Sequence, residues 1–319
     1  MFAARCIGVS LAVFILVYIF FSLLVSQGWK LMRSTLRPSS ARGAADLLFA
    51  LRVLPLGLSL FVTLAFTLPS FLLLEPRSTG EAIGAAPLAL GLCCLVLLGA
   101  GVTRAVLAQL RASRALAAWL SDAAFMQSQI NQSGIAVPIF RIANNAFALT
   151  VAGVCAPKVL VSEAAIAALT SRELRTALRH EIAHAIRHDN LRKLLFRFSV
   201  FPAITELEHA WSEETEMAAD DAAVSSFHDA LDLAAALIKV SRLGLVGSCG
   251  ELTMALLQSS TALSTRVHRL VAWNQPQKLQ SRGRWFYVVP AVGAIVIAAV
   301  TTYGSVLSQM HAVTEWLVR

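Results

Sequence analysis

Residues 170–186 read TSRELRTALRHEIAHAI, and this segment decides which fold the chain can adopt. Thr170 and Glu173 have the spacing of a capping box, which predicts that a helix begins at this point. Apolar residues then recur at helical spacing, at positions 174, 177, 178, 182 and 186. The segment therefore predicts an amphipathic helix with one buried face.

The polar side of this helix carries His180-Glu181-Ile182-Ala183-His184, an H-E-x-x-H motif. Two histidines four residues apart project from one helical face, so both imidazoles can bind one metal ion. Glu181 can then face the open coordination position, where zinc acidifies a water and the carboxylate takes its proton. The motif predicts a zinc metallopeptidase site with one ion per chain. The alternative is a solvated polar helix face without a metal.

The third ligand must come from another part of the sequence. The longer metzincin motif needs a glycine and a histidine where this chain has Arg187 and Asn190, so that class is excluded. His188 would lie too far from His180, one further turn along the helix. A carboxylate on a later helix remains. The candidates are Glu206, Glu208, Glu213, Glu214 and Glu216.

We favour Glu216 because it begins the segment Glu216-Met217-Ala218-Ala219-Asp220. Glu216 and Asp220 share a helical face, and the alanines between them permit close packing against another helix. Asp220 can then accept the second N–H of a ligand histidine. The alternative is that residues 206–221 form an acidic helix that is simply solvated.

Composition indicates a membrane protein. Hydrophobic residues make up 57% of the chain and charged residues 14%, and the mean hydropathy is +0.67. The cysteines have no paired spacing, which excludes a disulfide framework and a cysteine-based zinc site. The segments long and apolar enough to span a bilayer are 6–26, 47–74, 82–102 and 285–307. The first of these could alternatively be a signal peptide.

The distribution of basic residues predicts the orientation. Lysines and arginines gather in residues 27–46 and at both ends of residues 103–284, so these regions should face the cytoplasm. Residues 308–319 would then be a short tail on the opposite side. The net charge of +8 reflects this bias rather than a basic stripe, and we expect no nucleic-acid partner.

Residues 103–284 are numerous enough to form one globular domain with its own core. We expect a helix that runs on from the third span, followed by extended segments, at residues 105–132, 136–142, 146–153 and 159–161. The predicted fold is therefore a mainly α membrane protein with four transmembrane helices and a small α+β zincin-type metallopeptidase domain. Residues 147–153 could be an edge strand that pairs with substrate or an ordinary sheet strand. Residues 190–204 could be an amphipathic helix at the membrane surface or active-site rim, or a core helix.

Four short segments occur in a characteristic order: GVCAPKVLV at 153–161, Glu173-Leu174 before HEIAH, HDNL at 188–191 and EMAAD at 216–220. Together, residues 144–224 resemble the zinc domain of the bacterial beta-lactam sensor-transducers, the BlaR/MecR-type membrane zinc metallopeptidases. The resemblance implies a cytoplasmic zinc domain between the third and fourth spans, in a bacterial-type inner membrane. Antibiotic-sensing members carry an extracellular penicillin-binding domain after the last span, whereas only residues 308–319 follow it here. We therefore expect a stimulus from a partner sensor protein or from the spans, and a repressor protein as a possible target.

Residues 145–148, NAFA, resemble the related membrane endopeptidases that process prenylated proteins. That resemblance implies an arginine near the developing oxyanion, and Arg266 could take this catalytic role. Ser260 stands where those relatives have a histidine, which puts the match in doubt. The alternative for Arg266 is a solvated or lipid-facing charge.

These features predict a zinc metalloendopeptidase that cleaves a protein or peptide substrate at the cytoplasmic membrane face, in regulated proteolysis or signalling. Its zinc ligands would be His180, His184 and Glu216, and Glu181 would be the general base. One alternative is a membrane quality-control protease. Another is a non-catalytic, zinc-bound transducer that binds a cytoplasmic regulator. A transporter is disfavoured because Arg52 is the only charged residue inside the predicted spans.

Overall fold

The computed structural model describes residues 2–33, 40–75, 84–130, 136–143, 147–199, 205–243, 254–255, 260–273 and 303–314. The chain divides into two compact units. Unit 1 contains Met1–Lys30, Val53–Gly99 and Pro276–Arg319. Unit 2 contains Leu31–Arg52 and Ala100–Gln275, and it holds all the residues of the predicted metal site.

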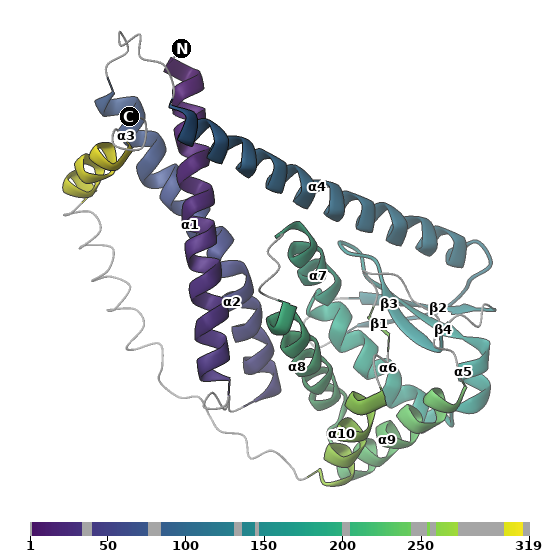
Figure 1. Cartoon of the computed structure of the whole chain (residues 1–319). Helices are drawn as coiled ribbons and strands as arrows, with labels where there is room; N and C mark the ends of the chain where they lie inside the picture. The colour runs from purple at the N-terminus through teal and green to yellow at the C-terminus, as the bar shows by residue number, and fades with distance from the viewer. Residues whose placement is uncertain are drawn as a thin grey trace. The chain divides into compact units, whose positions relative to one another are not determined.

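Long apolar helices dominate the N-terminal part of the chain (Figure 1). Their bounds are α1 (Phe2–Met32), α2 (Ala41–Val62), the π-helical turn η1 (Thr63–Thr67), α3 (Leu68–Leu74) and α4 (Ala85–Leu120). Among the described residues, three segments could cross a membrane by length and composition: Phe2–Leu31, Ala41–Leu74 and Ala85–Leu120. The chain therefore has the character of a membrane protein.

The helices are longer than two of the predicted spans, 6–26 and 82–102, because helical hydrogen bonding continues into the flanking residues. The second predicted span, 47–74, lies within Ala41–Leu74. Of the predicted fourth span, residues 285–302 lie outside the described residues. Residues 303–314 are helical.

The π-helical turn has a local cause in unit 1. Pro69 has no N–H, so it cannot donate to the carbonyl of Ala65, four residues earlier. Tyr303 Oη donates to this carbonyl instead, at 2.8 Å. The carbonyl of Ala65, which Pro69 cannot reach with an N–H, therefore accepts a hydrogen bond from a residue in the C-terminal part of the chain.

Unit 2 contains a five-stranded mixed sheet with the strand order β1-β2-β4-β3-β5. The strands are β1 (Ala124–Ile130), β2 (Ala136–Ile142), β3 (Leu149–Ala152), β4 (Lys158–Ser162) and β5 (Met254–Ala255). β2 and β4 are parallel, and the other pairs are antiparallel. The prediction of extended segments at 136–142, 146–153 and 159–161 is confirmed where the structure describes them.

One prediction about this sheet was wrong. The helix expected over 105–132 ends at Leu120, and residues 124–130 form β1 instead. Antiparallel pairing with the next strand, β2, from Ala124 opposite Arg141 to Ile130 opposite Ala136, overrides the local helix propensity. Of the two alternatives for residues 147–153, the ordinary sheet strand is confirmed, because β3 lies between β4 and β5, with Thr150 and Val151 paired to β5.

The helices of unit 2 follow the expected local signals. They are α5 (Glu163–Ala168), α6 (Ser171–Ile186), α7 (Asp189–Phe198), α8 (Thr205–Ala223), α9 (Phe227–Arg242) and α10 (Ser260–Val271). Ser162 caps α5, and Thr170 and Glu173 form the predicted capping box of α6. These bonds satisfy N–H groups that a helix start otherwise leaves without partners.

The core of unit 2 lies around α6, which packs on β3 and β4 and also against α8 and α9. Ala177, Leu178 and Ile182 form its buried face, as predicted, and they meet sheet residues such as Val151 and Val161. Burying one leucine, isoleucine or valine side chain stabilises a fold by about 1.5–3 kcal/mol. This packing fixes α6 in position, and the same helix carries the two histidines.

Candidate metal centre

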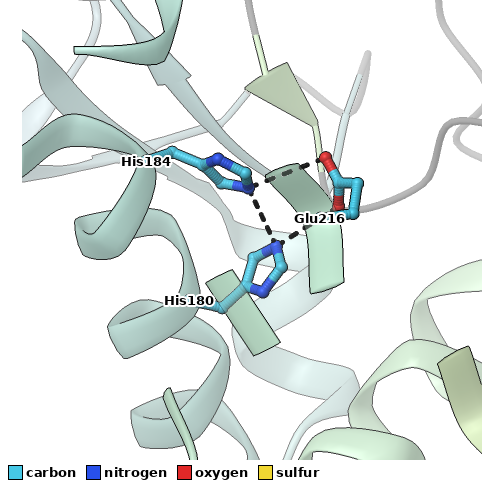
Figure 2. Close-up of side chains that lie close together, drawn as sticks. All are labelled: His180, His184 and Glu216. Carbon is cyan, nitrogen blue, oxygen red and sulfur yellow. Dashed lines mark hydrogen bonds and ion pairs between the residues drawn. The ribbon is translucent and has the colours of Figure 1, made fainter. Parts of the chain in front are cut away.

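Two helices bring three potential metal ligands together. His180 and His184 project from α6 toward α8, which contributes Glu216 (Figure 2). The two Nε2 atoms lie 3.2 Å apart, and oxygens of Glu216 lie 3.5 Å from Nε2 of His180 and 3.6 Å from Nε2 of His184. All three side chains are buried. Each residue offers one ligand atom within 4.8 Å of the others, so the cluster could hold a metal ion.

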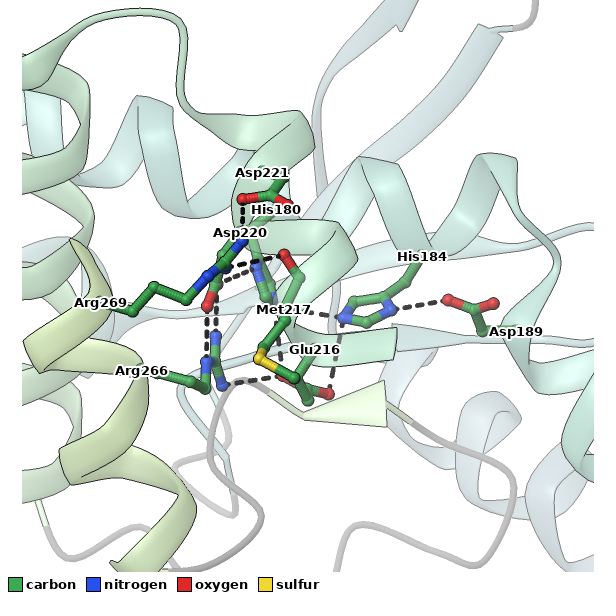
Figure 3. A network of polar contacts seen from close by, with 9 residues as sticks. All are labelled: His180, His184, Asp189, Glu216, Met217, Asp220, Asp221, Arg266 and Arg269. Atoms are coloured by element: carbon green, nitrogen blue, oxygen red, sulfur yellow. Dashed lines mark hydrogen bonds and ion pairs between the residues drawn. The ribbon is translucent and has the colours of Figure 1, made fainter. Parts of the chain in front are cut away.

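An aspartate lies behind each imidazole (Figure 3). Nδ1 of His184 lies 2.8 Å from Oδ2 of Asp189, and Nδ1 of His180 lies 2.9 Å from Oδ1 of Asp220. A proton on each Nδ1 is then shared with a carboxylate, which leaves the lone pair on Nε2. Two Nε2 lone pairs at 3.2 Å repel each other unless a proton or a metal ion lies between them. The tautomers that the aspartates favour are therefore those that suit a metal ligand.

The sequence did not assign a role to Asp189. Its position depends on His188, which has a φ of 53°, in the left-handed region that non-glycine residues seldom adopt. This turn separates α6 from α7, and Asp189 becomes the first residue of α7 with its side chain against His184. Asp189 is fully buried, and its contact with His184 follows from this turn, which the residue types alone do not reveal.

Asn190 secures the same turn to the sheet. Its Nδ2 donates to the carbonyl oxygens of Val151 and Gly153, both at 3.1 Å. Gly153 has a φ of 97°, and a Cβ there would lie 2.7 Å from the oxygen of Ala156, so only glycine fits. The end of β3 and the start of α7 are therefore held together beside the histidines.

α8 presents its acidic residues in the phase that the sequence predicted. Glu216 and Asp220 are buried, whereas Glu213 and Asp221 are exposed. Asp221 pairs with Arg269 of α10 (Figure 3). The alternative of an acidic helix that is merely solvated is therefore wrong for the face that carries Glu216.

Arg266 of α10 is 5% exposed and is neither solvated nor lipid-facing. Its Nε and Nη2 donate to the two oxygens of Asp220, at 2.8 and 2.7 Å, and its Nη1 donates to Oε2 of Glu216 at 2.8 Å. The structure thus places Arg266 directly against a potential ligand and against the aspartate behind His180. Its action on an oxyanion stays a prediction. Ser260 is the first residue of α10.

The buried charges at the centre shift one another's pKa values. Burial alone would raise the pKa of Glu216, but Arg266 and the histidines lower it to about 2. Arg266 and His180 likewise overcome burial and lower the pKa of Asp220. Burial would lower the pKa of His180, but its contacts with Asp220 and Glu216 raise it to about 9. The three groups therefore favour their charged forms at neutral pH.

Glu181 behaves differently from the other carboxylates. It is fully buried, and neither of its oxygens has a hydrogen-bond partner of good geometry among the described residues, although the backbone N–H of Val151 also acts to lower its pKa. Burial raises its pKa to about 8, although the nearby charges of His180 and Arg266 oppose the shift. A buried carboxylate without partners is costly to a fold. Such a group has the pKa range and the free oxygens of a residue that exchanges protons.

Comparison with known proteins adds no assignment. No protein-family model matches the chain, and no curated protein matches it significantly. The functional proposal for this site therefore depends on its own geometry and on the sequence motifs.

We predict that metal affinity rises with pH up to about 9, the pKa of His180. A metal ion must displace the His180 proton below that pH, so affinity should increase about tenfold per pH unit before it levels off. Competition with a chromogenic chelator between pH 6.5 and 9.5 measures this dependence. Asp220→Asn removes a contact that raises the pKa, so its plateau should begin at a lower pH. A flat profile between pH 7 and 9 in the parent protein would contradict the prediction.

Proposed function

We propose that this protein is a membrane-bound zinc metalloendopeptidase that cleaves a protein substrate at the cytoplasmic membrane face, in regulated proteolysis or signalling. The observation that supports this most strongly is the convergence of His180, His184 and Glu216 in the same buried centre as Glu181. Two nitrogen ligands and one carboxylate leave a tetrahedral ion with one open position, which is typical of catalytic zinc.

The distances between the donor atoms suit zinc. A tetrahedral ion with ligand bonds of about 2.0–2.2 Å separates its ligand atoms by about 3.3–3.6 Å. The two Nε2 atoms lie 3.2 Å apart, Oε1 of Glu216 lies 3.6 Å from Nε2 of His184, and Oε2 lies 3.5 Å from Nε2 of His180, so the two histidine–glutamate separations involve different oxygens of the carboxylate. Oε1 of Glu216 has no hydrogen-bond partner within the described part of the chain, which leaves it available as a ligand atom. The residues present therefore fit a zinc ion.

The chemistry follows from the roles of the surrounding residues. Zinc, when bound, would acidify a water and polarise the peptide carbonyl. Glu181 would take the proton of the attacking water and later deliver it to the leaving amine. Asp189 and Asp220 would keep the imidazoles oriented. Arg266 would hold the carboxylates of Glu216 and Asp220 in place, and any contact with an oxyanion would require it to leave one of them.

The location and the partners rest on sequence signals. The lysine and arginine bias around the apolar segments supports a cytoplasmic domain, and the resemblance to sensor-transducers supports a bacterial-type inner membrane and a repressor or sensor partner. The fourth span, at 285–307, is part of the same proposal. A quality-control protease would use the same site, and a non-catalytic transducer would keep the metal without hydrolysis.

We predict about one zinc ion per chain in the purified protein. His180→Ala should abolish zinc binding, and Glu216→Ala should reduce it strongly, because each removes one ligand of three. Elemental analysis of protein in detergent gives the stoichiometry. Glu213→Ala is the matched control, since this exposed glutamate lies on the same helix. Full zinc content in Glu216→Ala would show that the third ligand is a different residue.

We predict that Glu181→Gln keeps its zinc but loses peptide hydrolysis by about 10²–10⁴-fold, because glutamine cannot accept a proton. Cleavage of a labelled peptide library, with zinc content measured in the same samples, tests this. A non-catalytic transducer would instead retain its biological activity in Glu181→Gln, and that result would overturn the proposed enzymatic function.

We predict that residue 39 lies on the cytoplasmic side and residue 308 on the opposite side of the membrane. Single cysteines at Ser39 and Ser308, in a background without the native cysteines, should react differently with an impermeant maleimide in intact cells. Only position 308 should be labelled before lysis. Labelling of position 39 from outside would refute the cytoplasmic location of the substrate.

A further inference from the structure

Arg52 is the charged residue that the sequence places within a predicted span, and the structure gives it an extensive set of contacts in unit 2. Its side chain is 2% exposed. Nε and Nη2 donate to Oε1 of Glu208 at 3.0 and 2.8 Å. Nη1 donates to Oγ of Ser199 at 2.7 Å, and Nη2 donates to the carbonyl oxygen of Ser199 at 2.6 Å. Every nitrogen of the guanidinium is therefore bound.

These contacts join the end of one helix to the start of another. Ser199 is the C-cap of α7, where the last carbonyl groups of the helix have no helical partners and attract a cation. Glu208 lies in the first turn of α8. Arg52 thus links α2 with both α7 and α8, across 147 and 156 residues of sequence.

Aromatic packing supports the same junction. The ring of Phe196 in α7 lies 5.7 Å from the ring of Phe49 in α2 and 4.9 Å from the ring of Trp211 in α8. Arg52 also lies over the ring of Phe196, at 5.5 Å. Trp211 is 1% exposed, so the contact between Phe196 and Trp211 lies in the packed interior and not on the surface.

Both helices that Arg52 joins carry residues of the metal centre. α7 begins with Asp189, which lies against His184. α8 carries Glu216 two turns beyond Glu208, about 12 Å along the helix. A helix transmits a displacement of its end over this distance, because its backbone hydrogen bonds resist bending. The position of α8 relative to α6 therefore depends on how the end of α7, at Ser199, and the start of α8, at Glu208, are held. The distance from Glu216 to the histidines depends on it as well.

We propose that Arg52 is a positioning residue of the metal centre, through which the first half of α2 sets the coordination of Glu216. This inference rests on the proposed zinc site, but it does not require that the site hydrolyses peptides. It assigns α2, a helix apolar enough to cross a membrane, the role of the element through which the site is adjusted. Arg52 acts through Glu208 and Ser199 and touches none of the ligands.

The experiment uses the full chain in detergent and compares Arg52→Gln with Arg52→Lys. We expect Arg52→Gln to weaken zinc binding by roughly 3–30-fold, the range for residues that couple to a site without touching it. The visible spectrum of the cobalt-substituted protein should also change, because it reports ligand geometry. Arg52→Lys keeps the charge but lacks the forked donor geometry, so it should restore only part of the affinity.

Arg33→Gln is the matched control. Arg33 lies 3.7 Å from Glu206, also in the first turn of α8, but both side chains are more than half exposed, so its loss should leave zinc affinity unchanged. Glu208→Gln provides a second test if Arg52→Gln does not fold. The double variant should bind zinc no more weakly than the worse single variant, because both changes remove one interaction.

Unchanged zinc affinity and an unchanged cobalt spectrum in folded Arg52→Gln and Glu208→Gln would overturn the proposal, even if both variants melt at lower temperature. That result would mean that Arg52 only stabilises the fold. If the parent protein binds zinc but cleaves no peptide, the proposed enzymatic function fails while the test of Arg52 remains valid. The two proposals therefore fail on different measurements.

Discussion

The burial of negative charge beside the histidines is the constraint on which the rest of unit 2 depends. Glu216, Asp220 and Asp189 are all nearly inaccessible to solvent, and removing an ion from water costs several kcal/mol unless a partner compensates. Arg266 supplies the compensation for two of them by binding both carboxylates at once. α10 must therefore lie against α8, and it packs against α9 as well. The negative charge of Glu216 and Asp220 thus accounts for the position of α10, although α10 lies far from α6 in the sequence.

Local interactions explain what the sequence predicted correctly. The capping box of α6 and the i, i+4 spacing of His180 and His184 lie within single helical segments, where side-chain directions follow from the helix alone. The same is true of Glu216 and Asp220 on α8. Because the small residues between them allow α8 to approach α6, the pairing of the two helices could also be inferred. The structure contains the expected cluster of His180, His184 and Glu216. The identity of its metal and its activity stay predictions.

Interactions that form only in the folded chain account for what could not be predicted from the sequence. β1 was expected to be helical because nothing in residues 124–130 announces its pairing with β2. The role of Asp189 depends on the left-handed turn at His188, and the pairing of Arg266 with Asp220 joins residues 46 positions apart. From the sequence, Arg52 was predicted only to lie inside a transmembrane span, near one of its ends. Its partners, Ser199 and Glu208, lie in segments whose packing only the folded chain defines.

Glu181 connects the electrostatics of the site to its proposed chemistry. With a pKa of about 8, this carboxyl is mostly protonated at neutral pH when only the protein's own charges surround it, and a protonated carboxyl is no base. A divalent cation bound by the adjacent histidines would lower that pKa, since a nearby positive charge favours the carboxylate. Glu181 would thus favour its carboxylate form, the form that accepts a proton, when the centre holds its metal. This dependence on the metal requires that Glu181 is not bound to an arginine. Glu216 is bound to Arg266, so it would be charged with or without the metal.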